Sequence, residues 1–71
     1  MKNLTEFKAL PYSEKLDIVK AVFAELAKYY EYFKELHIYI ITHEKEISEE
    51  FLITSYDIAF KLHEKLEKSD F

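Results

Sequence analysis

Cysteine, glycine, arginine and tryptophan do not occur in this chain of 71 residues, and proline occurs once, at position 11. Without cysteine, neither a disulfide nor a zinc site built on thiolates can form. Without glycine, the glycine-rich loop that holds the phosphates of a nucleotide is excluded. The missing arginine and the net charge of −4 argue against DNA or RNA as the main ligand, because arginine makes most of the two-pronged contacts to phosphate and guanine.

Long apolar runs are also missing. Every window of about 18 residues contains a charged side chain, so no transmembrane span is predicted. The first ten residues contain Lys2, Glu6 and Lys8 where a secretory signal would have an apolar stretch. We therefore expect a cytoplasmic protein.

The chain has the size of one small domain, residues 1–71, and 49% of its residues are hydrophobic. In so small a domain, the free energy gained by burying apolar surface nearly equals the conformational entropy that is lost. Such domains are commonly completed by a disulfide, a metal or a second chain. Because the disulfide is excluded, we expect a homodimer.

Helix breakers are scarce, since neither glycine nor proline follows Pro11. This scarcity indicates a helical chain. Asn3 and Glu6 have the spacing of a capping box, so a short helix is expected from about Leu4 to Leu10. Pro11 should terminate this helix.

Two serines are expected to start the longer helices. Ser13 should cap the middle helix, with acidic residues in the first turn. Ser48 should cap the last helix, which is expected to run to about Lys68. Ile47 is placed to pack on Leu52 across this last start, as in a hydrophobic staple.

The middle region has one apolar position at every third or fourth residue, which is the periodicity of a helix packed between neighbours in a bundle. These positions are Leu16, Val19, Phe23, Leu26, Tyr30, Phe33, His37 and Ile40. We predict an all-α bundle of a short N-terminal helix and two longer antiparallel helices. This prediction lets the middle helix run unbroken from Ser13 to near Glu44, and a break near Tyr30 to Lys34 stays open as the alternative.

A β-hairpin is the competing interpretation of the second half. The segments from Leu36 to Thr42 and from Phe51 to Tyr56 are rich in β-branched and aromatic residues. The connection between them lacks the glycine, asparagine or proline of hairpin turns. Helices are therefore preferred.

Aromatic residues make up 17% of the chain and gather after Lys28, where the apolar stripe becomes too wide for one neighbouring helix to cover. Tyrosine and phenylalanine are frequent anchors of protein interfaces. An ordinary aromatic core explains the same residues equally well. The predicted interface consists of Tyr29, Tyr32, Phe33, Leu36, Ile38 and Tyr39.

Catalytic, cofactor-binding and metal-binding residues are not predicted. His43 with Glu46, and His63 with Glu67, have spacings that allow a surface metal site, but solvated helix residues are the preferred interpretation. His37 falls on the apolar stripe and is expected in the core or the interface. The acidic residues near position 46 are expected to be a solvated corner, and we expect no enzyme activity.

One segment resembles a known family. Residues 47–56, with the sequence ISEEFLITSY, look like the opening helix of the small Sda-type sporulation antikinases. The resemblance covers ten residues, and in that family the motif starts the chain, whereas here a long helical region precedes it. It implies a helical protein that binds a kinase without catalysis of its own.

These observations favour a small acidic helical protein that acts through protein–protein interaction, as a regulator, inhibitor or adaptor. The alternative is a helical DNA-binding transcriptional regulator whose dimer presents Lys61, Lys65 and Lys68. A metal-dependent bundle enzyme is a third class. Steep salt dependence of duplex binding would identify the second class, and bound metal in the purified protein would identify the third.

Overall fold

The computed structural model describes residues 1–68, and the part that it describes is all-helical. The helices are α1 (Leu4–Lys8), α2 (Tyr12–Leu26), α3 (Glu31–Thr42) and α4 (Glu49–Lys68), with a short 3₁₀ turn, η1 (Glu44–Glu46), before α4. The all-α prediction is confirmed. The β-hairpin alternative is wrong, because its two segments lie within α3 and α4.

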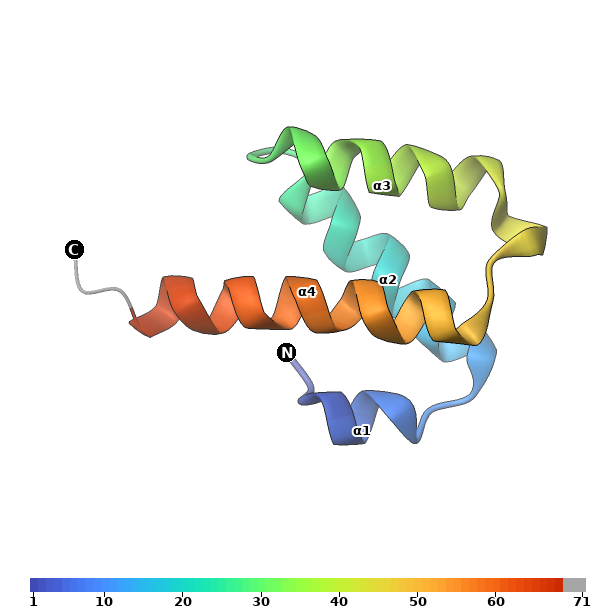
Figure 1. Cartoon of the computed structure of the whole chain (residues 1–71), viewed down its shortest axis with the longest axis horizontal. Helices are drawn as coiled ribbons and strands as arrows, with labels where there is room; N and C mark the ends of the chain where they lie inside the picture. Colours follow the sequence, from blue (N-terminus) through green and yellow to red (C-terminus); the bar gives the residue numbers. More distant parts are fainter. Residues whose placement is uncertain (69–71) are drawn as a thin grey trace.

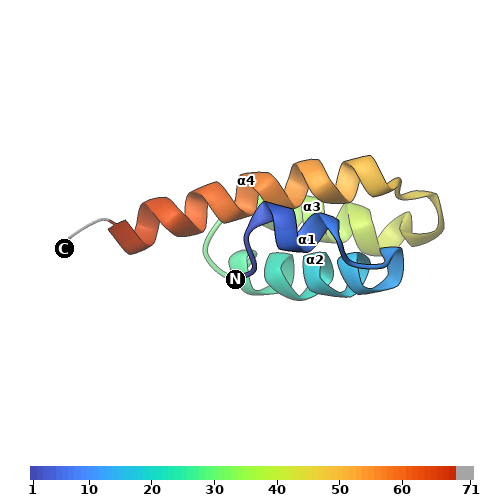
Figure 2. The same cartoon turned by 90° about the horizontal axis from the view of Figure 1, so that it is seen from below.

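The second helix is the centre of the arrangement, since α2 packs against both α3 and α4 while α1 packs on α4. Figure 1 shows α3 and α4 running in opposite directions with α2 crossing behind them. In the turned view (Figure 2), α4 lies above α2, with α1 in front of this pair and α3 behind it. Among the described residues, no helix is long and apolar enough to cross a membrane.

The unbroken middle helix is wrong, because α2 ends at Leu26 and residues 27–30 form a turn. Tyr30 has an extended backbone, and α3 then folds back on α2. This turn brings the rings of Phe23 and Phe33 to 5.2 Å from each other, whereas ten residues of continuous helix would separate them by about 15 Å. Packing of the two rings in the core stabilises the break, which needs neither glycine nor proline.

Most of the predicted apolar stripe points into the core. Leu16, Val19, Phe23, Phe33 and Ile40 are buried. The other three positions, Leu26, Tyr30 and His37, are half-buried. Because α3 folds back, the chain covers for itself part of the surface that an uninterrupted helix would have left to a second chain.

Two of the three predicted helix starts are confirmed. The Asn3 side chain accepts a hydrogen bond from the Glu6 amide at 2.8 Å, and the Ser48 hydroxyl accepts one from the Phe51 amide at 3.0 Å. Ser13 is not a cap, because α2 begins one residue earlier, at Tyr12, directly after Pro11. The fixed backbone angle of proline suits the position just before a helix.

The short helix α1 ends at Lys8 rather than Leu10, and Tyr56 holds it on α4. The rings of Phe7 and Tyr56 stack at 3.9 Å with their planes 2° apart. The Tyr56 hydroxyl donates a hydrogen bond to the Lys2 carbonyl oxygen. Burial raises the pKa of the Tyr56 hydroxyl, and the nearby negative charge of Glu6 raises it further.

Candidate protein-binding groove

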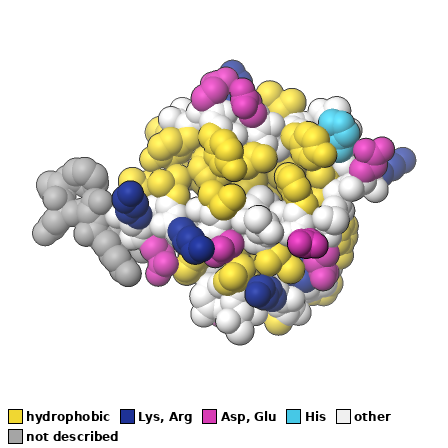
Figure 3. Space-filling view, viewed as in Figure 1, with side chains coloured by type: hydrophobic (Ala, Val, Ile, Leu, Met, Phe, Trp, Pro, Cys, Tyr) yellow, Lys and Arg dark blue, Asp and Glu magenta, His cyan; other side chains and the backbone are white. Residues whose placement is uncertain are grey.

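An apolar groove of about 230 Å³ lies between α3 and the start of α4. Three of its lining residues, Tyr32, Leu36 and Tyr39, come from α3, and Phe51 comes from α4. Glu35 of α3 is the remaining lining residue and the only charged one. The space-filling view (Figure 3) shows a band of apolar side chains along α3 and into the space between α3 and α4.

Helical spacing explains why α3 forms one wall of this groove. Tyr32, Leu36 and Tyr39 are four and three residues apart, so their side chains lie on one side of the helix. Phe33 and Ile40 are each one position further along the chain and are buried in the core. The buried contacts of Phe33 and Ile40 therefore fix the rotation of α3 about its axis. The side chains that line the groove then lie beside the core contact and stay partly open to solvent, with Tyr32 54% and Tyr39 46% exposed.

Phe51 forms the opposite wall because the Ser48 cap places it in the first turn of α4. Its half-buried ring lies 5.6 Å from the ring of Tyr39. The imidazole of His43 stacks on the Tyr39 ring at 4.4 Å, and its Nδ1 atom lies 3.1 Å from the Tyr39 carbonyl oxygen. These contacts hold the Tyr39 ring between α3 and α4.

The rim of the groove carries unpaired negative charge. Glu31 lies one turn before Glu35 on α3, and both carboxylates are exposed. In the described part of the chain, neither of the two takes part in an ion pair. Acidic side chains lie above and below the apolar band in Figure 3.

The ion pairs of the described residues engage other carboxylates. The paired acids are Glu49 with Lys15 at 3.2 Å, Glu44 with Lys20 at 3.0 Å, Glu25 with Lys28 at 3.2 Å and Asp57 with Lys61 at 3.0 Å. Of these four lysines, only Lys15 is buried. The acidic rim therefore keeps its charge available to a ligand.

The structure divides the predicted interface residues into three groups. Tyr32, Leu36 and Tyr39 line the groove. Phe33 is 3% exposed and belongs to the core of the chain itself. Tyr29, on the turn, and Ile38, on the outer side of α3, are exposed but do not line the groove.

Sequence analysis missed Phe51 and Glu35. Phe51 follows the Ser48 cap by three residues, and this spacing placed it in the first turn of a helix but not beside Tyr39. Their contact depends on how α3 and α4 meet, and therefore on the turn at residues 27–30. The place of Glu35 at the groove depends on the same turn, because the rotation of α3 decides which charged residue borders the apolar wall.

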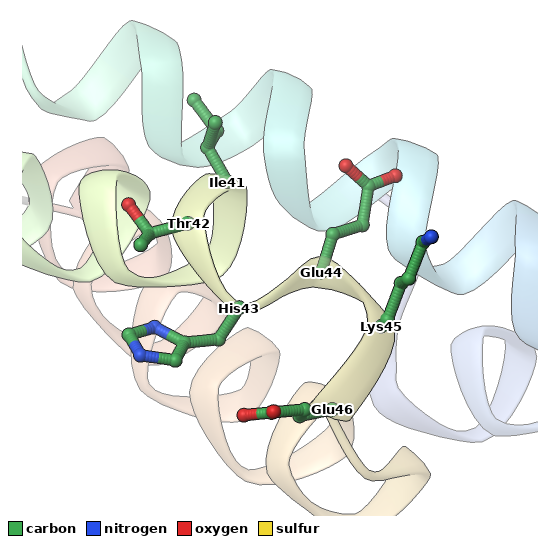
Figure 4. A pocket seen from close by; sticks show the side chains of 6 residues that line it. All are labelled: Ile41, Thr42, His43, Glu44, Lys45 and Glu46. Atoms are coloured by element: carbon green, nitrogen blue, oxygen red, sulfur yellow. The ribbon is translucent and has the colours of Figure 1, made fainter.

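A second surface depression of about 400 Å³ surrounds η1 and is lined by Ile41, Thr42, His43, Glu44, Lys45 and Glu46. Figure 4 shows Glu44 extending toward α2, where it pairs with Lys20, whereas His43 extends away from α2. Within residues 1–68, no group of three or more His, Asp or Glu side chains is arranged to hold a metal ion. Of the other pair with a suitable spacing, His63 with Glu67, the Glu67 side chain lies outside the described part.

The lysines of the DNA-binding alternative lie on the C-terminal half of α4. Lys61 pairs with Asp57, and Glu64 lies next to Lys65 in the sequence. The side chain of Lys68 is outside the described part. Acidic residues therefore alternate with these lysines along the helix.

Comparisons of the chain with models of protein families, with curated proteins and with solved structures find no match. The resemblance of residues 47–56 to the antikinases thus assigns no family. The groove between α3 and α4 is the surface feature that suggests a function.

Proposed function

We propose that this protein acts by binding another protein, without catalysis of its own, as a small regulator, inhibitor or adaptor. The observation that carries the proposal is the groove lined by Tyr32, Leu36, Tyr39 and Phe51. Aromatic side chains are enriched in protein interfaces because they bury a large area at a low entropy cost. Apolar grooves between helices are also a common site for binding a partner helix.

The exposed parts of Tyr32 and Tyr39 give such binding a substantial driving force. About half of each side chain is exposed, and covering roughly 100 Å² of each ring contributes about 2 kcal/mol per ring. Part of this gain offsets the freedom that two molecules lose when they associate. The ring of Tyr39 is already held by His43 and Phe51, which reduces the entropy cost of ordering it on binding.

The homodimer stays a prediction, and its basis has changed. The sequence argument assumed a long helix with more apolar surface than one chain can cover, whereas α3 in fact folds back on α2. What remains exposed on α3 is the groove wall and two outward isoleucines, Ile38 and Ile41. Self-association is therefore one use of this surface and is tested separately below.

A matched pair of variants tests the proposal. Tyr39 and Ile38 are neighbours in the sequence and similarly exposed, but only Tyr39 lines the groove. Tagged wild-type chain, Tyr39→Glu and Ile38→Glu are purified from native cells, and the retained proteins are compared by mass spectrometry. We expect a protein that the wild type and Ile38→Glu retain and Tyr39→Glu loses. Identical sets for all three chains would refute the groove as the binding surface.

A further inference from the structure

We propose that the occupant of the groove is an amphipathic α-helix of another protein, with an apolar stripe between the walls and Lys or Arg side chains facing the edge of α3 that carries Glu31 and Glu35. This inference rests on the proposed function and specifies the chemistry of the partner. Its support is the shape of the groove, the charge of its rim and the poor fit of a second copy of the chain.

The shape of the groove matches a helix. Its walls belong to two helices that run in opposite directions (Figure 1), and the wall on α3 repeats once per turn, at Tyr32, Leu36 and Tyr39. The first and last of these positions are seven residue steps apart, or about 10 Å along the helix axis. A partner helix of about three turns, with large apolar side chains at positions i, i+3 or i+4, and i+7, covers this length.

The negative charge of the rim favours a partner helix that carries basic residues on either side of its apolar stripe. Glu35 lines the groove on α3, and Glu31 lies one turn before it on the same helix. Neither carboxylate takes part in an ion pair within the described part of the chain. A helix with Lys or Arg beside its apolar stripe forms ion pairs along this edge of α3, whereas one with acidic flanks is repelled.

A second copy of this chain fits the groove poorly. Two-fold symmetry pairs a surface with itself. If two copies of α3 pack antiparallel through Tyr32, Leu36 and Tyr39, the edge that carries Glu31 and Glu35 meets the same edge of the copy. Like charges then face each other between chains that each have a net charge of −4. The groove is therefore assigned to a partner of opposite charge.

The probe is a displayed library of helical peptides of about 18 residues, five turns long. Leucine is fixed at positions i, i+3, i+4 and i+7, and the flanking positions vary among lysine, glutamate and glutamine. Selection on the full chain should enrich lysine at the flanks. The selected peptide is then measured by fluorescence anisotropy against the wild type, the double variant Glu31→Gln with Glu35→Gln, and the control Glu14→Gln.

Glu14 is a matched control because, like Glu31, it is an exposed acid in the first turn of a helix. It lies on α2 and does not line the groove. We expect the double variant to weaken binding about tenfold and the control to change it less than about twofold. Raised salt should reduce the difference.

The outcomes separate the partner chemistry from the proposed function. If peptides with lysine and glutamate flanks bind equally and Tyr39→Glu abolishes both, the basic partner is refuted and protein binding stands. A dimer of the chain that competes with the peptide for the groove would also refute the basic helix. Failure to select any peptide, or binding that Tyr39→Glu leaves unchanged, would overturn both proposals.

Discussion

The ring of Phe51, in the first turn of α4, lies 5.6 Å from the ring of Tyr39 on α3. This contact joins the two walls of the groove at the end where the 3₁₀ turn links the helices. Ser48 fixes the position of Phe51 through the helix cap, and the imidazole of His43 also stacks on Tyr39. The shape of the groove therefore depends on a few contacts that single substitutions can remove.

Replacing Ser48 with alanine should lower the free energy of unfolding by about 1 kcal/mol, because the Phe51 amide loses its acceptor. Urea unfolding followed by circular dichroism measures this change. Ser13→Ala is the control, since Ser13 lies inside the first turn of α2 and caps nothing. The control should stay within about 0.5 kcal/mol of the wild type. Equal effects of the two substitutions would contradict the assignment of the caps.

Lys15 should matter more for stability than the other paired lysines. It is 2% exposed, and its ammonium group donates hydrogen bonds to the Leu10 carbonyl at 2.8 Å and to Glu49 at 3.2 Å. Lys15→Ala removes the buried donor and leaves a cavity, and it should cost about 2–3 kcal/mol. Lys20→Ala breaks an exposed pair with Glu44 and should cost less than about 1 kcal/mol. A thermal unfolding series with a larger loss for Lys20→Ala would disprove this ranking.

The raised pKa of the Tyr56 hydroxyl predicts that the free energy of unfolding falls at alkaline pH. Burial and the charge of Glu6 raise its pKa above the ordinary value of 10.0, so folding favours the neutral hydroxyl. The stability that the neutral Tyr56 hydroxyl contributes is fully present below the pKa of the unfolded state. This stability is lost as the pH rises through the higher pKa of the folded state.

Urea midpoints of the wild type, Tyr56→Phe and Tyr29→Phe, measured between about pH 8 and about pH 11, test this linkage. Tyr56→Phe lacks the hydrogen bond to the Lys2 carbonyl, so it should be less stable at neutral pH but lose less stability on the way to pH 11. Tyr29 is 73% exposed, and its variant should follow the wild type. If Tyr56→Phe shows the same alkaline loss as the wild type, the effect does not come from Tyr56.

The oligomeric state should not depend on Tyr39. The acidic edge beside Tyr39 disfavours a second copy in the groove, so sedimentation equilibrium should give the same mass for the wild type and for Tyr39→Glu. A dimeric wild type with a monomeric Tyr39→Glu would place the second copy in the groove. A wild-type mass near 8.6 kDa would refute the homodimer that the sequence predicts.

Local signals in the sequence predicted the parts of the fold that depend on neighbours along the chain. Each of the two caps, at Asn3 and at Ser48, is a hydrogen bond between a side-chain oxygen and the backbone amide three residues later. The helical periodicity identified core positions such as Val19 and Ile40. The turn at residues 27–30 was beyond such signals. It contains no residue that breaks a helix, and it is stabilised by the distant contact between Phe23 and Phe33.

The candidate site was predicted in part for the same reason. The stripe on α3 identified Tyr32, Leu36 and Tyr39 as interface residues, and the structure places them together. The pattern could not show that Phe33 is buried, because the fold-back at residues 27–30 turns it toward Phe23. Nor could it place Phe51 opposite Tyr39, since that contact follows from the same turn.

The most direct test of the groove is the response of its own side chains to a bound helix. The chain is labelled at the leucine and isoleucine methyl groups and titrated with the lysine-flanked peptide from the library, and its methyl spectra are recorded by nuclear magnetic resonance. Leu36 lines the groove, whereas Ile38 and Ile41 are exposed elsewhere on α3. We expect the Leu36 signals to shift and those of Ile38 and Ile41 to stay in place. Shifts at Ile38 and Ile41 with unchanged Leu36 signals would contradict the account.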